Sequence, residues 1–465
     1  MRRLPLAFAL AAALSPLGAA HAEDLLQTYE QARQSDPQYA AAESGRLVTR
    51  EGAVQARAAL LPQINGSASL SRSRGDSEGS QVFGGSPLPP SDSSSDSTSR
   101  SIGVNLDQVL FDFGRFSSVR SQKALAKAGD FQLESAGDSL VTRTSAAYFN
   151  VLVALETLSA AEASEAALKK QFDLASKRLE VGLAPITDVH EARAQYDSAR
   201  ANTILTRNAL QDSYQALIEI TGQPPATLKA LPKDFQPQLP AEKDVDGWVG
   251  TALDSNPALK AQEYQLRSAE ADVSTARAGH LPTLYLGATY GKNHNDGSST
   301  NNINRVVSDF ENDSKSRSVG LTLNVPIFAG GATQSRVRQA LAQRDVAQDQ
   351  YEQDKRALER NTRNAYQTLV AGVSEVEARR LAVVSAQSAY DASQVGLEVG
   401  TRTVVDVLIN QQNLFNAQQA YALAKYNFLQ SRLLLDQAAG TLDVDDVQDV
   451  NRMLTVDTPV GEAKP

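Results

Sequence analysis

Two kinds of hydrophobic pattern alternate along the chain, and the first has the period of a β-strand. Residues 318–328 place an apolar side chain at every second position, with small or polar residues between them: Val319, Leu321, Leu323, Val325 and Ile327. Residues 101–111 repeat this pattern, and residues 63–72 and 283–291 carry weaker versions of it. The alternation predicts four strands, each with one apolar face. The segments between them, 71–100 and 291–317, are rich in Ser, Gly, Asp and Asn and are predicted to be solvated loops.

The second pattern has the period of a long α-helix. Residues 115–181 and 332–399 contain no proline, and each stretch is long enough for a helix of about 100 Å. Apolar residues recur in them at the three-four spacing of coiled coils: Tyr148, Val151, Leu155 and Leu158, then Tyr366, Leu369, Val373 and Val376. Shorter helices are predicted at 186–221 and 404–439, and helices that begin at Pro37 and Pro257 precede the strands. The chain is therefore predicted to be mainly α-helical.

The same order of elements occurs twice, because the chain is an internal duplication. The string LEVGLAPITDV at 179–189 returns as LEVGTRTVVDV at 397–407, and SIGVNLDQVLF at 101–111 matches SVGLTLNVPIF at 318–328. We divide the chain into a first repeat at 23–222, a connector at 223–246, a second repeat at 247–440 and a C-terminal segment at 441–465. The connector and the C-terminal segment are expected part-way along the helices, and the chain is expected to end in a flexible tail.

Composition limits the location and the chemistry of the protein. Residues 1–22 combine two arginines, an apolar run and a small-residue cleavage pattern, which indicates a secretory signal peptide. The net charge of −9 argues against a nucleic acid partner, and the absence of cysteine excludes disulfides and thiolate metal sites. His190, His280 and His294 lie too far apart in sequence to suggest a metal site. Because the chain also lacks a recognisable nucleophile–base pair or phosphate loop, we predict no enzyme activity, no cofactor and no metal.

The predicted strands suit an outer membrane. No apolar run is long enough for a membrane-spanning helix, whereas strands of about 9–11 residues with one apolar face can cross a membrane. Four strands cannot close a barrel, and an open edge in lipid leaves backbone groups without hydrogen bonds. Other subunits must then supply strands: two chains give eight, with an interior filled by side chains, and three give twelve, with room for a lumen.

The chain resembles the TolC-type outer-membrane efflux channels over roughly residues 23–445. The resemblance rests on the duplication and on five strings: LLPQI (60–64), FDFGR (111–115), FAGGATQSRVRQA (328–340), VGTRTVVDVL (399–408) and LFNAQQAYALAKYNFL (414–429). It implies a homotrimer with one twelve-stranded β-barrel, four strands from each chain, in the outer membrane of a Gram-negative bacterium. The barrel would continue into a periplasmic α-helical barrel. The implied partners are outer-membrane lipid, a periplasmic adaptor protein and an inner-membrane efflux pump or ABC exporter, and the implied cargo is drugs, toxic small molecules or secreted proteins.

The repeated string is predicted to form a turn between two helices in each repeat. Gly182 and Gly400 can adopt the positive φ that ends a helix, and Pro185 and Thr403 can begin the next helix. Asp406 follows Thr403 by three residues, which is the spacing of a capping box.

The resemblance also places an iris-like gate at these turns. The family positions that hold the periplasmic entrance shut match three residues of this chain: Thr187, Asp188 and Arg402. The position that matches Asp406 belongs to an acidic ring at the entrance. Two residues depart from the family pattern, since Ile409 replaces a second acidic residue of the ring and Leu397 replaces a tyrosine of the gate network. We therefore expect a simpler gate and a less acidic ring.

Two alternatives stay open at this point. The helical hairpins alone also suit a periplasmic coiled-coil structural or adaptor protein without a pore. An outlet dedicated to type I protein secretion would carry the same sequence features as a drug efflux outlet, because the inner-membrane partner selects the cargo.

Overall fold

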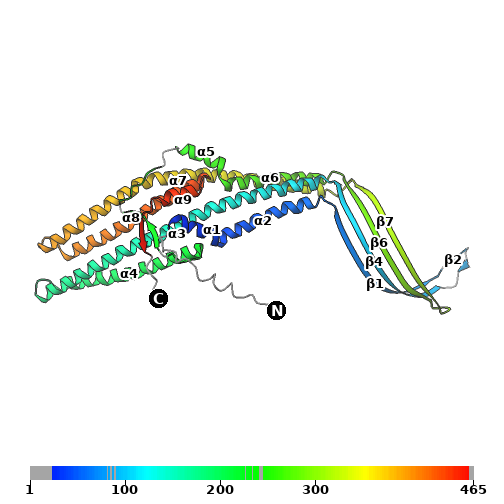
Figure 1. Ribbon diagram of the computed structural model, residues 1–465, viewed down its shortest axis with the longest axis horizontal. Helices are drawn as coiled ribbons and strands as arrows, with labels where there is room; N and C mark the ends of the chain where they lie inside the picture. The colour runs from blue at the N-terminus through cyan, green and yellow to red at the C-terminus, as the bar shows by residue number, and fades with distance from the viewer. Residues whose placement is uncertain are drawn as a thin grey trace, which may run out of the picture. The chain divides into compact units, whose positions relative to one another are not determined.

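The computed structural model describes residues 23–80, 82–83, 86–87, 91–225, 227–232, 234–239 and 244–459 (Figure 1). The predicted signal peptide, residues 1–22, lies outside these residues. The chain folds as two compact units. Among the described residues, the first, which we call the helical unit, contains those within 23–46, 130–261 and 352–459, and the second, the strand unit, contains those within 47–129 and 262–351. Both units draw on both predicted repeats, because each repeat contributes strands to one unit and a helical hairpin to the other.

The strand unit contains a four-stranded antiparallel sheet in the order β1-β4-β6-β7. Its strands are β1 (Gln63–Gly79), β4 (Ser91–Phe111), β6 (Thr283–Asn301) and β7 (Val306–Asn324); a short pair, β2 (Val82–Phe83) and β3 (Ser86–Pro87), comes between β1 and β4 in the sequence.

The strand predictions were wrong in their extent. The predicted strands 63–72, 101–111 and 283–291 are too short, and most of the predicted loops 71–100 and 291–317 is strand. Pairing continues through these polar segments because a β-ladder uses main-chain hydrogen bonds and needs no apolar side chain. The prediction 318–328 instead runs past the end of β7 at Asn324. Pro326 has no N–H group to donate to a ladder.

The register gives the sheet two chemically different faces, since residues paired across the strands share a face. Ile64 pairs with Leu106, Leu106 with Ala288, and Ala288 with Val319. Around this row lies what we call the apolar band: Ile64, Ala68, Leu70, Ile102, Val104, Leu106, Leu284, Leu286, Ala288, Tyr290, Val319, Leu321 and Leu323. The opposite face also carries Tyr285 and Val109 but otherwise mainly small and polar residues: Asn65, Ser67, Ser69, Ser101, Gly103, Asn105, Gly287, Thr289, Ser318, Gly320 and Thr322.

Helices continue from the ends of these strands. The strand unit includes the C-terminal parts of α2 (Pro37–Ala58) and α6 (Pro257–Ala278) and the N-terminal parts of α3 (Phe113–Glu180) and α7 (Ala332–Glu398). The hydroxyls of Ser121 and Ser268 lie 2.9 Å apart in the buried contact between α3 and α6. The Tyr285 hydroxyl donates to Asp112 Oδ2 at 2.9 Å, which ties β6 to the residue before α3.

The helical unit is built on two hairpins, α3 with α4 (Ile186–Thr221) and α7 with α8 (Val404–Ala439). The helices α4 and α8 cover the ranges predicted for them, and α3 and α7 lie within two residues of theirs. The short elements α1 (Leu25–Ser35), α5 (Val245–Ser255) and α9 (Val444–Asn451) complete the unit together with the paired strands β5 (Thr227–Ala230) and β8 (Val456–Pro459). The predicted connector and C-terminal segment therefore pair with each other through β5 and β8.

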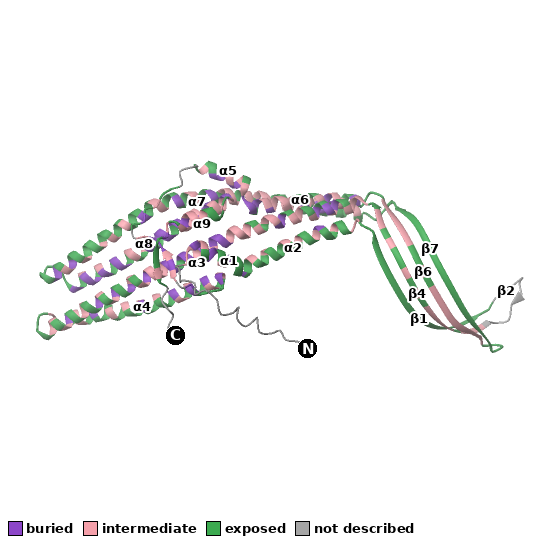
Figure 2. Cartoon of the chain, in the orientation of Figure 1, coloured by how far each residue is buried: buried purple, intermediate pink, exposed green. Residues whose placement is uncertain are grey.

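The residues predicted from coiled-coil spacing belong to the core of the helical unit. Tyr148, Val151 and Leu369 are fully buried there. Buried residues are spread along the helices, whereas the described residues of the four-stranded sheet are exposed or intermediate (Figure 2). Among the described residues, no helix has the length and apolar character needed to cross a membrane.

An ion pair between a buried lysine and a partly exposed glutamate joins α8 to α3. Only 4% of the Lys425 side chain is exposed, and its Nζ lies 2.9 Å and 3.0 Å from the two carboxylate oxygens of Glu156. The Tyr426 hydroxyl donates to the same carboxylate at 3.0 Å, and burial raises the pKa of Tyr426, so this hydroxyl keeps its proton. Because a charge in the protein interior needs its partner, the pair fixes how α8 lies against α3.

Candidate gate at the helical hairpin turns

The turn of the first hairpin joins α3 to α4. Gly182 has a φ of +74°, in the left-handed region that favours glycine. Backbone hydrogen bonds from Gly182 N to Leu179 O, at 3.0 Å, and from Leu183 N to Arg178 O, at 2.7 Å, satisfy carbonyls at the end of α3. Pro185 is the N-cap residue of α4, and its fixed φ suits the start of a helix. The turn thus has the glycine end and proline start that the sequence predicted.

The turn of the second hairpin joins α7 to α8 and contains the predicted capping box. Gly400 has a φ of +78°. The Thr403 hydroxyl accepts from Asp406 N at 3.2 Å, and an Asp406 carboxylate oxygen accepts from Thr403 N at 2.9 Å. The backbone hydrogen bond from Thr403, followed by the one from its hydroxyl, lowers the pKa of Asp406. Asp406 is therefore ionised at neutral pH.

The Arg402 side chain packs closely on Gly396, whose role the sequence did not reveal. A Cβ built on Gly396 would lie 2.6 Å from Arg402 Cγ, and the Gly396 carbonyl accepts from Arg402 N at 3.1 Å. No residue larger than glycine fits there without moving the arginine. The only sequence signal was a glycine inside a helical pattern, four residues before the glycine that ends the helix.

The Arg402 side chain lies near Asp406 of its own hairpin and lines one cavity with Asp188 of the other hairpin. Its Nη1 lies 4.0 Å from Asp406 Oδ1, and 61% of the arginine side chain is exposed. Asp188 of α4 and Arg402 also line one cavity of about 170 Å³ between the two turns. Within the described residues no hydrogen bond or ion pair joins Arg402 to Asp188 or to the exposed Thr187. The predicted link between the hairpins stays a prediction, and the structure adds Asp406 as a neighbour of Arg402.

A small cluster of buried apolar residues lies next to both turns. It contains seven buried residues: Leu168, Ala175, Ala192, Leu397, Val404, Val407 and Leu408. Leu397, which departs from the family pattern, is buried in this cluster and packs there as a core residue. Ile409, the second departure, is 55% exposed. The two aromatic rings of Phe172 and Tyr196 stack beside the cluster with an interplanar angle of 5°.

Residues 28–223 and 248–441, which include the sheet strands and both hairpins, match the sequence profile of the family described as outer membrane efflux protein. The chain belongs to this family. The resemblance inferred from the sequence is thereby confirmed.

Named relatives of this outer membrane efflux protein include an outer membrane protein and a protease secretion protein. The chain is 35% identical to outer membrane protein TolC of Vibrio cholerae, over 96% of this chain and 98% of the relative. It is 29% identical to the alkaline protease secretion protein AprF of Pseudomonas aeruginosa, over 92% and 87% of the two chains. In fold it is similar to the outer membrane channel CmeC of Campylobacter jejuni, with a TM-score of 0.71 and 20% identity over 93% of this chain and 90% of that one.

The efflux protein therefore lies in the outer membrane of a Gram-negative bacterium, reaches into the periplasm and acts as an efflux channel. Its family and structural neighbours are channel proteins rather than enzymes. The alternative of a periplasmic coiled-coil protein without a pore is not supported, because the matching family consists of outer membrane efflux proteins.

Proposed function

We propose that three copies of this chain form one channel, closed by a twelve-stranded barrel in the outer membrane and extended by a tunnel of helices into the periplasm. The observation that carries this proposal is the four-stranded sheet with one apolar face, one small and polar face, and two edge strands, β1 and β7.

The edges require partner strands. Within the described residues β1 pairs only with β4, and β7 pairs only with β6. An unpaired strand edge in hydrocarbon costs several kcal/mol for each unsatisfied backbone group, because lipid offers no hydrogen bonds. Pairing β7 of one chain with β1 of the next satisfies both edges. Repeating this contact three times closes a barrel of twelve strands, which is wide enough for a lumen, whereas two chains give an eight-stranded barrel that side chains fill.

The two faces then acquire different environments. The apolar band faces lipid acyl chains, in line with the outward alternation of membrane strands. The opposite face lines the lumen with residues such as Asn65, Ser67 and Thr289, whose small or polar side chains leave space for water and cargo.

The hairpin turns form the gate at the periplasmic end of this channel. In the closed state Arg402 interacts with Asp406 of its own chain and with Asp188 and Thr187 across the cavity between the turns. Two observations support this arrangement. The Arg402 side chain packs closely on Gly396 and keeps its guanidinium exposed, and Arg402 lines the same cavity as Asp188. Three copies of Asp406 form the acidic ring. A docked periplasmic adaptor protein, coupled to an inner-membrane efflux pump or ABC exporter, opens the gate by separating the hairpins.

Efflux and protein secretion are both supported as uses of the channel, because the chain matches the outer membrane efflux protein family and its relatives include a protease secretion protein. The cargo is set by the inner-membrane partner. Deletion of the gene tests both uses at once, with drug susceptibility and secreted protein measured in the same strain.

The assembly is tested with the purified protein in detergent. We expect a particle with the protein mass of three chains that opens ion-conducting pores in planar lipid bilayers. A monomer, or a trimer that never conducts, would refute the proposal.

A further inference from the structure

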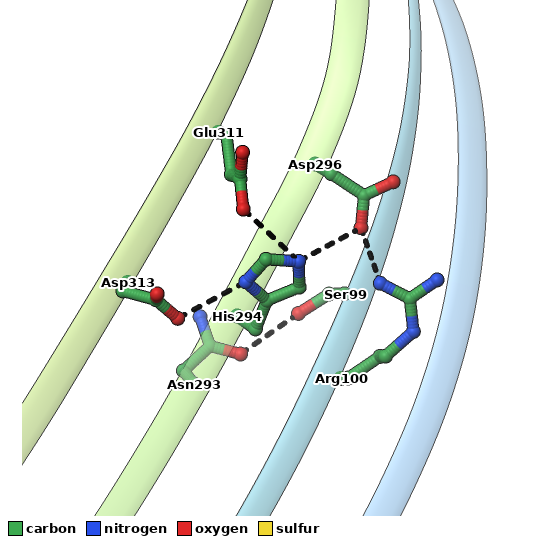
Figure 3. A network of polar contacts seen from close by, with 7 residues as sticks. All are labelled: Ser99, Arg100, Asn293, His294, Asp296, Glu311 and Asp313. Atoms are coloured by element: carbon green, nitrogen blue, oxygen red, sulfur yellow. Dashed lines mark hydrogen bonds and ion pairs between the residues drawn. The ribbon is translucent and has the colours of Figure 1, made fainter.

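Four ionisable side chains form a square where β6 and β7 extend beyond the apolar band (Figure 3). His294 of β6 lies directly opposite Asp313 of β7, and Asp296 lies directly opposite Glu311. Every second residue of a strand shares a face, so all four lie on the face that carries the apolar band, four or more residues past Tyr290. Two carboxylates directly opposite each other repel, and this is unfavourable unless a cation lies between them.

The histidine ring is oriented with one nitrogen toward each end of this square. His294 Nδ1 lies 3.0 Å from Asp313 Oδ1, a hydrogen bond in which the ring N–H donates to the carboxylate. His294 Nε2 lies 3.4 Å from Asp296 Oδ1 and 3.9 Å from Glu311 Oε1. With the proton on Nδ1, the Nε2 lone pair points at two carboxylates, an arrangement that a cation at Nε2 stabilises.

The neighbouring basic side chains neutralise only part of this charge. Arg100 of β4 bonds to Asp296 Oδ1, the oxygen that lies nearest His294 Nε2, so an ion at Nε2 would take the other oxygen of Asp296 or displace the guanidinium. Lys292 and Lys315 form the next cross-strand pair toward the membrane. In the described part of the chain, no lysine or arginine lies within 4.0 Å of Glu311 or Asp313.

We propose that this square binds a divalent transition metal ion of the Zn²⁺ class, with His294 Nε2, Glu311 and Asp296 as ligands. Imidazole together with carboxylates suits Zn²⁺, whereas Ca²⁺ and Mg²⁺ prefer oxygen ligands alone. Zinc–ligand bonds of about 2.0–2.2 Å in a tetrahedron place ligand atoms about 3.3–3.6 Å apart. The 3.4 Å and 3.9 Å separations around Nε2 approach this spacing. His294, Glu311 and Asp313 each offer one ligand atom within 4.8 Å of the other two, so Glu311 lies within reach of an ion bound to the histidine; Asp296 is not in this group and would have to approach Glu311 on binding.

Asp313 has a positioning role in this arrangement. A metal-binding histidine commonly donates its second N–H group to a carboxylate, which fixes the tautomer and makes the ligand more basic. The 3.0 Å contact between Nδ1 and Asp313 has this geometry. Glu311 is 74% exposed, so water can complete the coordination. The bound ion would join the edge strand β7 to β6 outside the lipid and separate the two opposed carboxylates.

Sequence reasoning missed this candidate because it compared the histidines only with one another. The carboxylates come within reach of His294 through the register of β6 with β7, and part of both strands was predicted as loop.

The site lies within one chain and is tested independently of the trimer. The untagged full-length protein is stripped with a chelator in detergent and titrated with Zn²⁺ alone, with bound metal counted by equilibrium dialysis. We expect one ion per chain. His294→Gln should weaken binding at least about 100-fold and Asp313→Asn about 10- to 100-fold. His280→Gln is the matched control, since His280 is exposed in the same unit and no carboxylate contact accompanies it among the described residues; its binding should equal that of the unmodified protein.

Co²⁺ provides a second readout that needs no variant. Its visible absorption and its spin coupling to a ring nitrogen should report one imidazole ligand per ion. Equal Zn²⁺ binding by His294→Gln and the unmodified protein would overturn the proposal. So would a protein that binds no Zn²⁺ and whose His294 ring is shown by NMR to be doubly protonated, because the cation would then be a proton.

Discussion

Replacement of Arg402 by serine should open the periplasmic gate. The change removes the guanidinium that lies 4.0 Å from Asp406 and shares a cavity with Asp188, while the turn keeps its shape because Gly400 and the capping box of Thr403 set the backbone. Serine is smaller than arginine, so it fits over Gly396 without a clash.

The size of the effect follows from the exposure of the arginine. Because 61% of the Arg402 side chain is exposed, its ion pair is screened by water. An exposed pair changes an equilibrium constant by a factor of about 1.4 to 5. If each of three chains loses one pair, the equilibrium constant between the closed and open states shifts toward the open state by a factor of about 3 to 150. This shift is large enough to detect and small enough for a docked partner to produce in the unmodified channel.

Single-channel recording in planar bilayers measures this shift. We expect Arg402→Ser to raise the mean conductance and the time spent in open levels. Arg193→Ser is the matched control, because it removes an arginine of similar exposure, 67% against 61%, and breaks its ion pair with Asp197, at 3.7 Å, within α4. Asp188→Asn separates the two possible partners: it should resemble Arg402→Ser if the link between the hairpins forms. A conductance of Arg402→Ser equal to that of Arg193→Ser, in trimers of normal yield, would refute the gate assignment.

Three further outcomes follow from named contacts. Asp406→Ala should reduce the cation preference of the channel and its block by multivalent cations; unchanged selectivity would contradict the acidic ring. Glu156→Gln should lower the free energy of unfolding, measured with denaturant, by about 2–4 kcal/mol, because Lys425 is left buried without a counter-charge. A decrease below about 0.5 kcal/mol would show that water reaches the lysine. Burial, with a smaller contribution from Glu134, raises the pKa of Asp138 to about 7. Folding therefore takes up a proton there, and stability should fall as pH rises from about 4 to 7; Asp138→Asn should flatten this slope, and an unchanged slope would contradict the assignment.

The limits of the helices could be predicted because residues near each turn determine them. Gly182 and Gly400 end one helix, and Pro185 and Thr403 start the next, through backbone preferences and hydrogen bonds that span a few residues. The same local chemistry made the Thr403–Asp406 capping box visible in the sequence.

The strands and the gate contacts depend on partners that are distant in sequence. Ser71 to Gly79 carry no apolar alternation, yet they continue β1 because β4 pairs with them along the main chain. The approach of Arg402 to Gly396 and the cavity that Asp188 shares with Arg402 arise from packing around the turns. A single sequence gives residue types at these positions, and the distances come only from the fold.

The closure of the sheet by neighbouring chains is tested most directly by cysteine cross-linking. The chain has no cysteine, so Ser67→Cys on β1 can be combined with a single cysteine on β7 at Ser318, Gly320 or Thr322, all on the small and polar face. In outer membranes under mild oxidation, at least one combination should give a disulfide-linked product of three chains and no product with more than three. Only monomers with every combination, or products that continue beyond three chains, would contradict a barrel of three copies.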